Sequence, residues 1–161
     1  MKIAYLHGLE SSNDPTSLKI IWLNNNFDQV YTPSIKYHNK ESFTIIIAHI
    51  KKQNPDYIIG SSMGGYFAYL IGATLGIPTI LFNPAVIGRS FDPVVDDSNL
   101  KETNHNVFLG KTDKVISGAL VQSYFSTYGI GNFAYTRYDG AHQVSAEVFI
   151  DAIKNVTGIF N

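Results

Sequence analysis

A serine flanked by glycines stands where a short apolar segment meets a longer one. The segment Gly60-Ser61-Ser62-Met63-Gly64 fits the pattern G-x-S-x-G, whose central serine acts as a nucleophile on acyl carbonyls. Residues 57–59 before it are typical of a strand, and the apolar run after Gly65 is typical of a helix. Glycines two positions to either side of Ser62 permit the sharp turn between these elements. The pattern predicts Ser62 as a nucleophile; the alternative interpretation is a Gly/Ser-rich loop that only begins a helix.

A serine hydroxyl needs a base, and two histidines follow Ser62 in the chain. His142 lies in the segment 139–142, after the last expected strand and before the last expected helix. This position predicts a loop at the edge of the sheet where the strands end. His105 instead precedes a strand, at the opposite edge, and is expected to be a solvated loop residue. We therefore predict His142 as the base.

Two aspartates compete for the acid that orients this base. Asp139 is three residues from His142 in the sequence, whereas Asp113 follows the expected strand 106–109 at its carboxyl end. In this type of site the acid comes after the serine and before the histidine, from the loop of a preceding strand. The order favours Asp113. An alternative role for Asp113 is the cap of a helix N-terminus.

The tetrahedral intermediate of such a reaction needs two backbone N–H donors. We expect the first from Met63, directly after the nucleophile, and the second from Leu9, in the loop after the first strand. His7 is expected to brace this loop rather than act as a second base. Its neighbour Glu10 is a further candidate for the pocket. Asn83 follows another strand and is expected either to contact substrate or simply to end that strand.

These residues need a scaffold in which strands alternate with helices. Short β-branched or aromatic runs predict six strands, at residues 2–6, 29–32, 57–60, 79–82, 106–109 and 133–138. Helical patterns cover residues 43–50, with Ser42 as a possible cap, and residues 65–75 and 145–155. The segment 85–105 is expected to be a long loop with at most one short helix. The alternation predicts a three-layer α/β/α sandwich with a mainly parallel sheet.

Composition limits the classes of function that remain. The 161 residues predict a single domain over 1–161, and a net charge of −1 without a basic run argues against nucleic-acid binding. The absence of cysteine excludes disulfides, zinc–thiolate sites and a thiol nucleophile. We expect no metal and no cofactor, because metal-ligand spacing and phosphate-binding loops are missing. Without a signal peptide or membrane span, the expectation is a cytoplasmic protein, monomeric or homodimeric.

Several segments together resemble the small bacterial esterases of the YqiA type, within the α/β-hydrolase superfamily. The resemblance covers most of the chain and rests on segments 5–12, 60–66, 82–86, 110–115 and 140–142. It implies carboxylester hydrolysis, with Ser62, Asp113 and His142 as the catalytic triad.

The predicted function is therefore a serine hydrolase that cleaves small or short-chain acyl esters through an acyl-enzyme. Two alternatives remain at this stage. One is thioester hydrolysis or acyl transfer by the same three residues. The other is a non-catalytic binding protein with a hydrolase-like fold.

Overall fold

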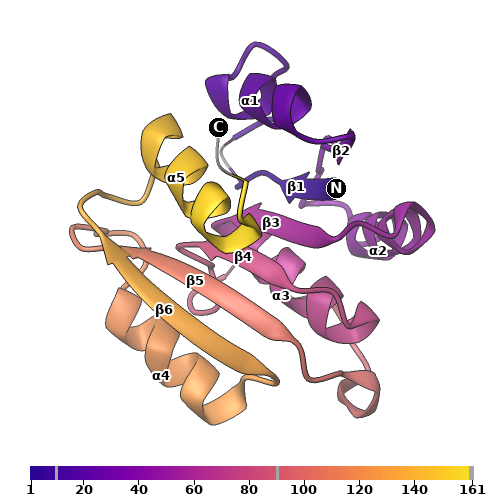
Figure 1. The fold of residues 1–161 in the computed structure, drawn as a ribbon. Helices are drawn as coiled ribbons and strands as arrows, with labels where there is room; N and C mark the ends of the chain where they lie inside the picture. Colours follow the sequence, from indigo (N-terminus) through magenta and orange to yellow (C-terminus); the bar gives the residue numbers. More distant parts are fainter. Residues whose placement is uncertain (10, 90, 160–161) are drawn as a thin grey trace.

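Six parallel strands form one sheet in the computed structural model, which describes residues 1–9, 11–89 and 91–159 (Figure 1). The spatial order is β2-β1-β3-β4-β5-β6. The strands are β1 (Lys2–Leu6), β2 (Gln29–Tyr31), β3 (Tyr57–Ser61), β4 (Thr79–Phe82), β5 (Asn104–Gly110) and β6 (Asn132–Tyr138). After β2 the chain returns past β1 to form β3, so the direction of strand addition reverses between β1 and β3. Functional groups gather at the carboxyl ends of strands beside such a reversal.

Helices cover both faces of the sheet and create two separate apolar cores. On one face lie α1 (Leu18–Asn26) and α5 (Ala146–Thr157); on the other lie α2 (Ser42–Gln53), α3 (Met63–Leu75) and α4 (Gly118–Tyr128) (Figure 1). Successive residues of a strand point to opposite faces. Accordingly, Ile58 packs with α2 and α3, whereas the next residue, Ile59, packs with α1 and α5. The predicted three-layer sandwich with a parallel six-stranded sheet is confirmed.

Two helices, α1 and α4, lie outside the helical patterns recognised in the sequence. Each buries only a narrow stripe, Ile20 and Leu23 in α1, and Val121 and Phe125 in α4. About half of the remaining positions are Asn, Ser, Thr or Tyr, which are weak helix formers on their own. These helices are stabilised by packing on the sheet rather than by intrinsic propensity.

Two further expectations differ from the structure. Ser42 is the first helical residue of α2 rather than its cap, and its hydroxyl donates to the Lys36 carbonyl at 2.7 Å. The segment 85–105 holds the short helix η1 (Asp97–Asn99), as expected, but β5 begins inside it at Asn104. None of the helices in the described ranges combines the length and apolar character needed to cross a bilayer.

Candidate active site

Ser62 occupies a strained turn between the end of β3 and the start of α3. Its backbone has φ 54° and ψ −120°, a combination that side-chain-bearing residues rarely adopt. The Ser62 N–H donates to the Phe82 carbonyl at 2.9 Å, and the Ser62 carbonyl accepts from the N–H groups of Tyr66 and Ala85. Strain of this kind persists only where surrounding contacts enforce it, and it clusters at functional sites.

The glycines around Ser62 are required by close backbone approach. A Cβ on Gly60 would lie 2.2 Å from the Gly64 carbonyl oxygen, and a Cβ on Gly64 would lie 2.1 Å from the Leu6 carbonyl oxygen. Neither space admits a methyl group. Gly8 is also close, since its Cβ would lie 3.3 Å from the Ser62 Cβ. The G-x-S-x-G pattern therefore lets α3 begin directly against the end of β1.

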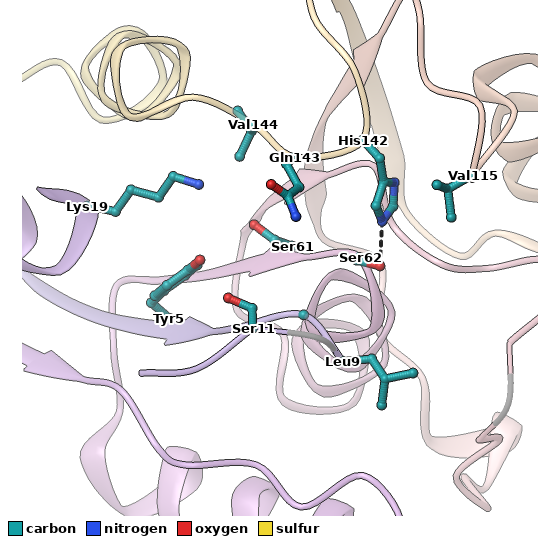
Figure 2. Close-up of a pocket in the computed structure, with 11 residues that line it drawn as sticks. Tyr5, Leu9, Ser11, Lys19, Ser61, Ser62, Val115, His142, Gln143 and Val144 are labelled. Atoms are coloured by element: carbon teal, nitrogen blue, oxygen red, sulfur yellow. Dashed lines mark hydrogen bonds between the residues drawn. The ribbon is translucent and has the colours of Figure 1, made fainter. Parts of the chain in front are cut away.

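Three residues from distant segments form a hydrogen-bonded chain. The Ser62 hydroxyl lies 3.0 Å from His142 Nε2, and His142 Nδ1 lies 2.8 Å from Asp113 Oδ2 (Figure 2 draws the first contact). Because a carboxylate only accepts, Nδ1 carries the proton toward Asp113 and Nε2 is left to accept from the serine. The arrangement has the geometry of a nucleophile, a base and an orienting acid.

The second oxygen of Asp113 is also engaged, which holds the carboxylate in one orientation. Asp113 Oδ1 accepts from the N–H groups of Val115 at 2.8 Å and Ile116 at 2.9 Å. The Asp113 side chain is only 1% exposed. Asp139, the competing acid, is 90% exposed and pairs with Lys111 at 2.7 Å. The structure thus brings Asp113 to the histidine and leaves Asp139 on the surface.

Asn83 lies behind the histidine and ties three loops together. It is 2% exposed, and its side-chain N–H group lies 2.9 Å from the His142 carbonyl and 2.6 Å from the Tyr138 hydroxyl. Its side-chain oxygen accepts from the Gly110 N–H at 2.8 Å. Asn83 is not part of the described lining of the pocket. The alternative of substrate contact is therefore not supported, and Asn83 holds the loop that carries His142.

His7 braces the loop after β1. The ring is 4% exposed; Nε2 accepts from the Ile35 N–H at 3.0 Å, so Nδ1 donates to the Gly8 carbonyl at 2.7 Å. Burial lowers the pKa of His7, which keeps the ring neutral in this role. Tyr37 donates to the His7 carbonyl from the other side. His7 does not belong to the described pocket lining, and Glu10 lies outside the described residues.

The two backbone N–H groups predicted to stabilise an oxyanion belong to Met63, which follows Ser62, and to Leu9, which lines the same pocket as Ser62. Met63 is the first residue of α3, and the first N–H groups of a helix have no acceptor within it. Leu9 follows Gly8, whose backbone packs against Ser62, and its side chain is 38% exposed at the pocket. The positions of Met63 and Leu9 are compatible with the predicted role of their N–H groups as donors to an oxyanion next to Ser62.

A pocket of about 400 Å³ opens over Ser62 and His142 (Figure 2). Its walls come from the end of β1 and the following loop, the start of α1, the end of β3, and the loops after β5 and β6. Sequence reasoning did not predict a pocket role for the wall residues Tyr5, Lys19, Ser61, Val115, Gln143 and Val144. Ser61 and Gln143 adjoin the predicted serine and histidine, so that adjacency was an available signal. The position of Lys19 in the pocket wall could not be predicted, because helix α1, which carries it, was not predicted from the sequence.

His105 was expected to be solvated, and here the prediction is wrong. The residue belongs to β5 and is 1% exposed. Its Nδ1 lies 2.8 Å from the Thr79 hydroxyl and its Nε2 lies 3.1 Å from the Ile130 carbonyl. Burial lowers the pKa of His105 to about 4. The ring packs against Phe133 and Tyr69 and serves the core, not the site.

The described residues contain no group of three or more acidic, histidine or cysteine side chains placed to hold a metal ion.

The sheet order, the strained serine after β3 and the helix that follows it define an α/β-hydrolase fold, and comparisons with known proteins agree. The chain belongs to the uncharacterised protein family UPF0227, whose sequence pattern matches residues 2–128. The predicted resemblance to YqiA-type members of the α/β-hydrolase superfamily is thereby confirmed. No curated protein matches the chain.

Three solved structures illustrate the likeness in fold. A candidate hydrolase of the α/β superfamily from Xanthomonas campestris pv. campestris has a TM-score of 0.73 at 14% identity, covering 98% of each chain. Est1E from Butyrivibrio proteoclasticus has a TM-score of 0.68 at 16% identity, covering 97% of this chain and 86% of its own. S-formylglutathione hydrolase from Staphylococcus aureus has a TM-score of 0.68 at 16% identity, and the match covers 98% of this chain and 79% of the hydrolase chain.

Proposed function

We propose that the protein is a serine hydrolase that cleaves small acyl esters through an acyl-enzyme. The observation that carries the proposal is the Ser62–His142–Asp113 chain, with contacts of 3.0 Å and 2.8 Å at the mouth of a pocket. A serine alone is a weak nucleophile, so a neutral imidazole within reach of its proton is the essential requirement.

In the proposed first step, Ser62 Oγ forms a bond to the ester carbonyl carbon while His142 Nε2 takes the hydroxyl proton. Asp113 stabilises the imidazolium that forms, and the N–H groups of Leu9 and Met63 stabilise the oxyanion. Collapse of the intermediate breaks the bond to the alcohol oxygen, which receives the proton from His142. Water then attacks the acyl-enzyme with His142 again as base, releasing the acid and restoring Ser62.

The test is Ser62→Ala, assayed with a 4-nitrophenyl ester and with a fluorophosphonate probe that labels activated serines. We expect the wild-type protein to hydrolyse the ester and take up the label. The variant should lose the label and about 10⁶-fold in kcat, as removal of a triad nucleophile does. Ser12→Ala, a change at an exposed serine, is the matched control and should retain both properties. If the wild-type protein neither reacts with the probe nor hydrolyses the ester, the result favours the alternative of a non-catalytic binding protein.

Thioester hydrolysis is the second candidate, because one of the similar structures is an S-formylglutathione hydrolase, and that substrate is a thioester. The same three residues would perform it, with a thiolate in place of the alkoxide as leaving group. Assays of matched oxygen esters and thioesters with the same acyl group distinguish the two. A kcat/KM for the oxygen ester equal to or above that of the thioester supports the primary proposal.

A further inference from the structure

The pocket has two chemically different sides. Leu9 and Val115 lie on one side of the Ser62–His142 pair in Figure 2. On the other side, together with Val144, lies a set of polar side chains that the proposed reaction does not use. We call this set the polar arm; it consists of Tyr5, Ser11, Lys19, Ser61 and Gln143.

Lys19 is the only charged side chain in the described pocket lining. It extends from the start of α1 toward the pocket (Figure 2). Its ammonium nitrogen lies 5.4 Å from the centre of the Phe149 ring. Among the described residues Lys19 forms no ion pair. Burial lowers its pKa, because the ammonium ion has lost part of its hydration. A bound anion would offset this loss, which makes the site favourable for negative charge.

Two hydroxyl groups, those of Tyr5 and Ser61, stand in the same arm. Ser61 Oγ is buried and has no hydrogen-bond partner within the described chain. The Tyr5 hydroxyl lies close enough to Ser61 to interact with it, and burial, the larger effect, raises the pKa of Tyr5, so the phenol remains a neutral donor. A ligand oxygen that reaches Lys19 in the arm could accept a hydrogen bond from the Tyr5 hydroxyl.

We propose that the polar arm binds a carboxylate on the substrate, so that the enzyme hydrolyses esters that also carry a free carboxylate. The inference rests on the proposed serine hydrolase function. Lys19 supplies the charge, and the Tyr5 hydroxyl supplies a neutral donor to the same anion. The carboxylate stays intact; only the ester bond at Ser62 is broken. It can belong to the acid part or to the alcohol part of the ester, and the two are separated by experiment.

Two pairs of esters test the proposal. Mono-4-nitrophenyl adipate is compared with methyl 4-nitrophenyl adipate, which places the charge on the acid part. The acetate ester of 3-(4-hydroxyphenyl)propionate is compared with its methyl ester, which places the charge on the alcohol part. In at least one pair the anionic member should have a kcat/KM about tenfold higher, mostly through KM, since a charge-assisted hydrogen bond is lost in the neutral member.

Substitutions at Lys19 assign this preference to the arm. Lys19→Met should bring the ratio of kcat/KM between the anionic and the neutral ester of a pair close to one, mainly by raising KM for the anionic ester, whereas Lys19→Arg should keep most of the preference. Lys52→Met, at an exposed lysine of α2, is the matched control and should behave as the wild type. A wild-type protein without preference in either pair, or a preference that survives Lys19→Met, overturns the proposal.

A binding measurement separates this inference from the proposed function. Calorimetry on the Ser62→Ala protein compares monomethyl adipate with dimethyl adipate. Binding of the anion that is lost in the Lys19→Met double variant supports the carboxylate subsite even if the wild type hydrolyses no ester. Hydrolysis of the neutral esters, together with equal binding of the charged and neutral probes, overturns the subsite and leaves the hydrolase intact.

Discussion

Asp113 and Asp139 carry the same functional group and differ only in surroundings. Asp113 is nearly inaccessible, and its two oxygens are divided between His142 and the backbone of its own loop. Asp139 is exposed beside Lys111, where solvent screens its charge. Only the first can hold an imidazole in one orientation and stabilise its positive charge during a reaction.

This contrast leads to a paired prediction. Asp113→Asn should lower kcat by about 10⁴-fold, because an amide can donate to Nδ1 and stabilise the wrong tautomer of His142. Asp139→Asn should change kcat less than about twofold. Steady-state hydrolysis of a 4-nitrophenyl ester by both variants is the measurement. A larger loss in Asp139→Asn than in Asp113→Asn would reverse the assignment of the acid.

Neighbouring strands and the loops that follow them are connected by hydrogen bonds from buried polar side chains as well as by strand pairing. Asn83, at the end of β4, joins the start of the loop after β5 to the loop after β6. It adopts φ 43°, a left-handed conformation that asparagine tolerates better than most residues. His105, in β5, links β4 through Thr79 to the connection between α4 and β6 through Ile130.

Removal of the Asn83 side chain should misplace His142. Asn83→Gly keeps the left-handed backbone accessible but deletes the amide, so we expect kcat to fall by about 10²-fold with a smaller change in KM. Tyr138→Phe, which removes only one of the amide's partners, should have a milder effect. The measurement is kcat and KM for ester hydrolysis by both variants, with circular dichroism to check that each variant is folded. An unchanged kcat in a folded Asn83→Gly protein would refute the positioning role.

The buried His105 should make stability depend on pH. Its pKa is about 4 in the folded protein and about 6.5 when unfolded, so between these values the unfolded chain binds more protons. The free energy of unfolding should therefore fall as the pH drops from about 6.5 toward 4, by up to about 3 kcal/mol. His7, whose pKa burial also lowers, contributes in the same direction.

Urea unfolding at pH 7.5 and pH 5 measures this dependence. The difference in the free energy of unfolding between pH 7.5 and pH 5 should be smaller in His105→Gln than in the wild type. It should stay unchanged in His49→Gln, at an exposed helical histidine. The comparison uses the pH dependence rather than absolute stability, because replacing a buried ring also leaves a packing defect. An equal pH dependence in wild type and His105→Gln would contradict the prediction.

At the scale of the whole molecule, the pocket lies where four parallel strands end, beside the reversal between β1 and β3. The apolar side of the pocket is partly open to solvent, because Leu9 is 38% and Val115 70% exposed. Between β4 and β5, the described residues contain only the short helix η1 and no long helix that could cover the site.

Such a pocket should favour short acyl chains. In a series of neutral 4-nitrophenyl esters, kcat/KM for the butyrate should exceed that for the palmitate by at least about tenfold. A volume of about 400 Å³ is at the small end for ligand pockets, and a long chain extending past Val115 would remain in water and gain little from burial. Initial rates below the solubility limit of each ester are the measurement. Efficiency that keeps rising beyond eight carbons would contradict this expectation.

The sequence by itself determined the local features of the protein. Ser62 was recognisable because glycine spacing and a strand-to-helix transition are encoded in adjacent residues. The six strands were recognisable because they are short runs rich in β-branched or aromatic residues, and chain order pointed to Asp113 and His142. The helices α1 and α4 were not, since packing on the sheet stabilises them more than their own composition does.

Only the tertiary structure decided how distant residues meet. It placed Asp113 within 2.8 Å of His142, buried His105 in the core, and turned Asn83 inward to hold a loop. It also brought Lys19, Tyr5 and Ser61 from three elements to one side of the pocket. These contacts depend on strand order and helix placement, which arise from burial of apolar surface over the whole chain rather than from neighbouring residues.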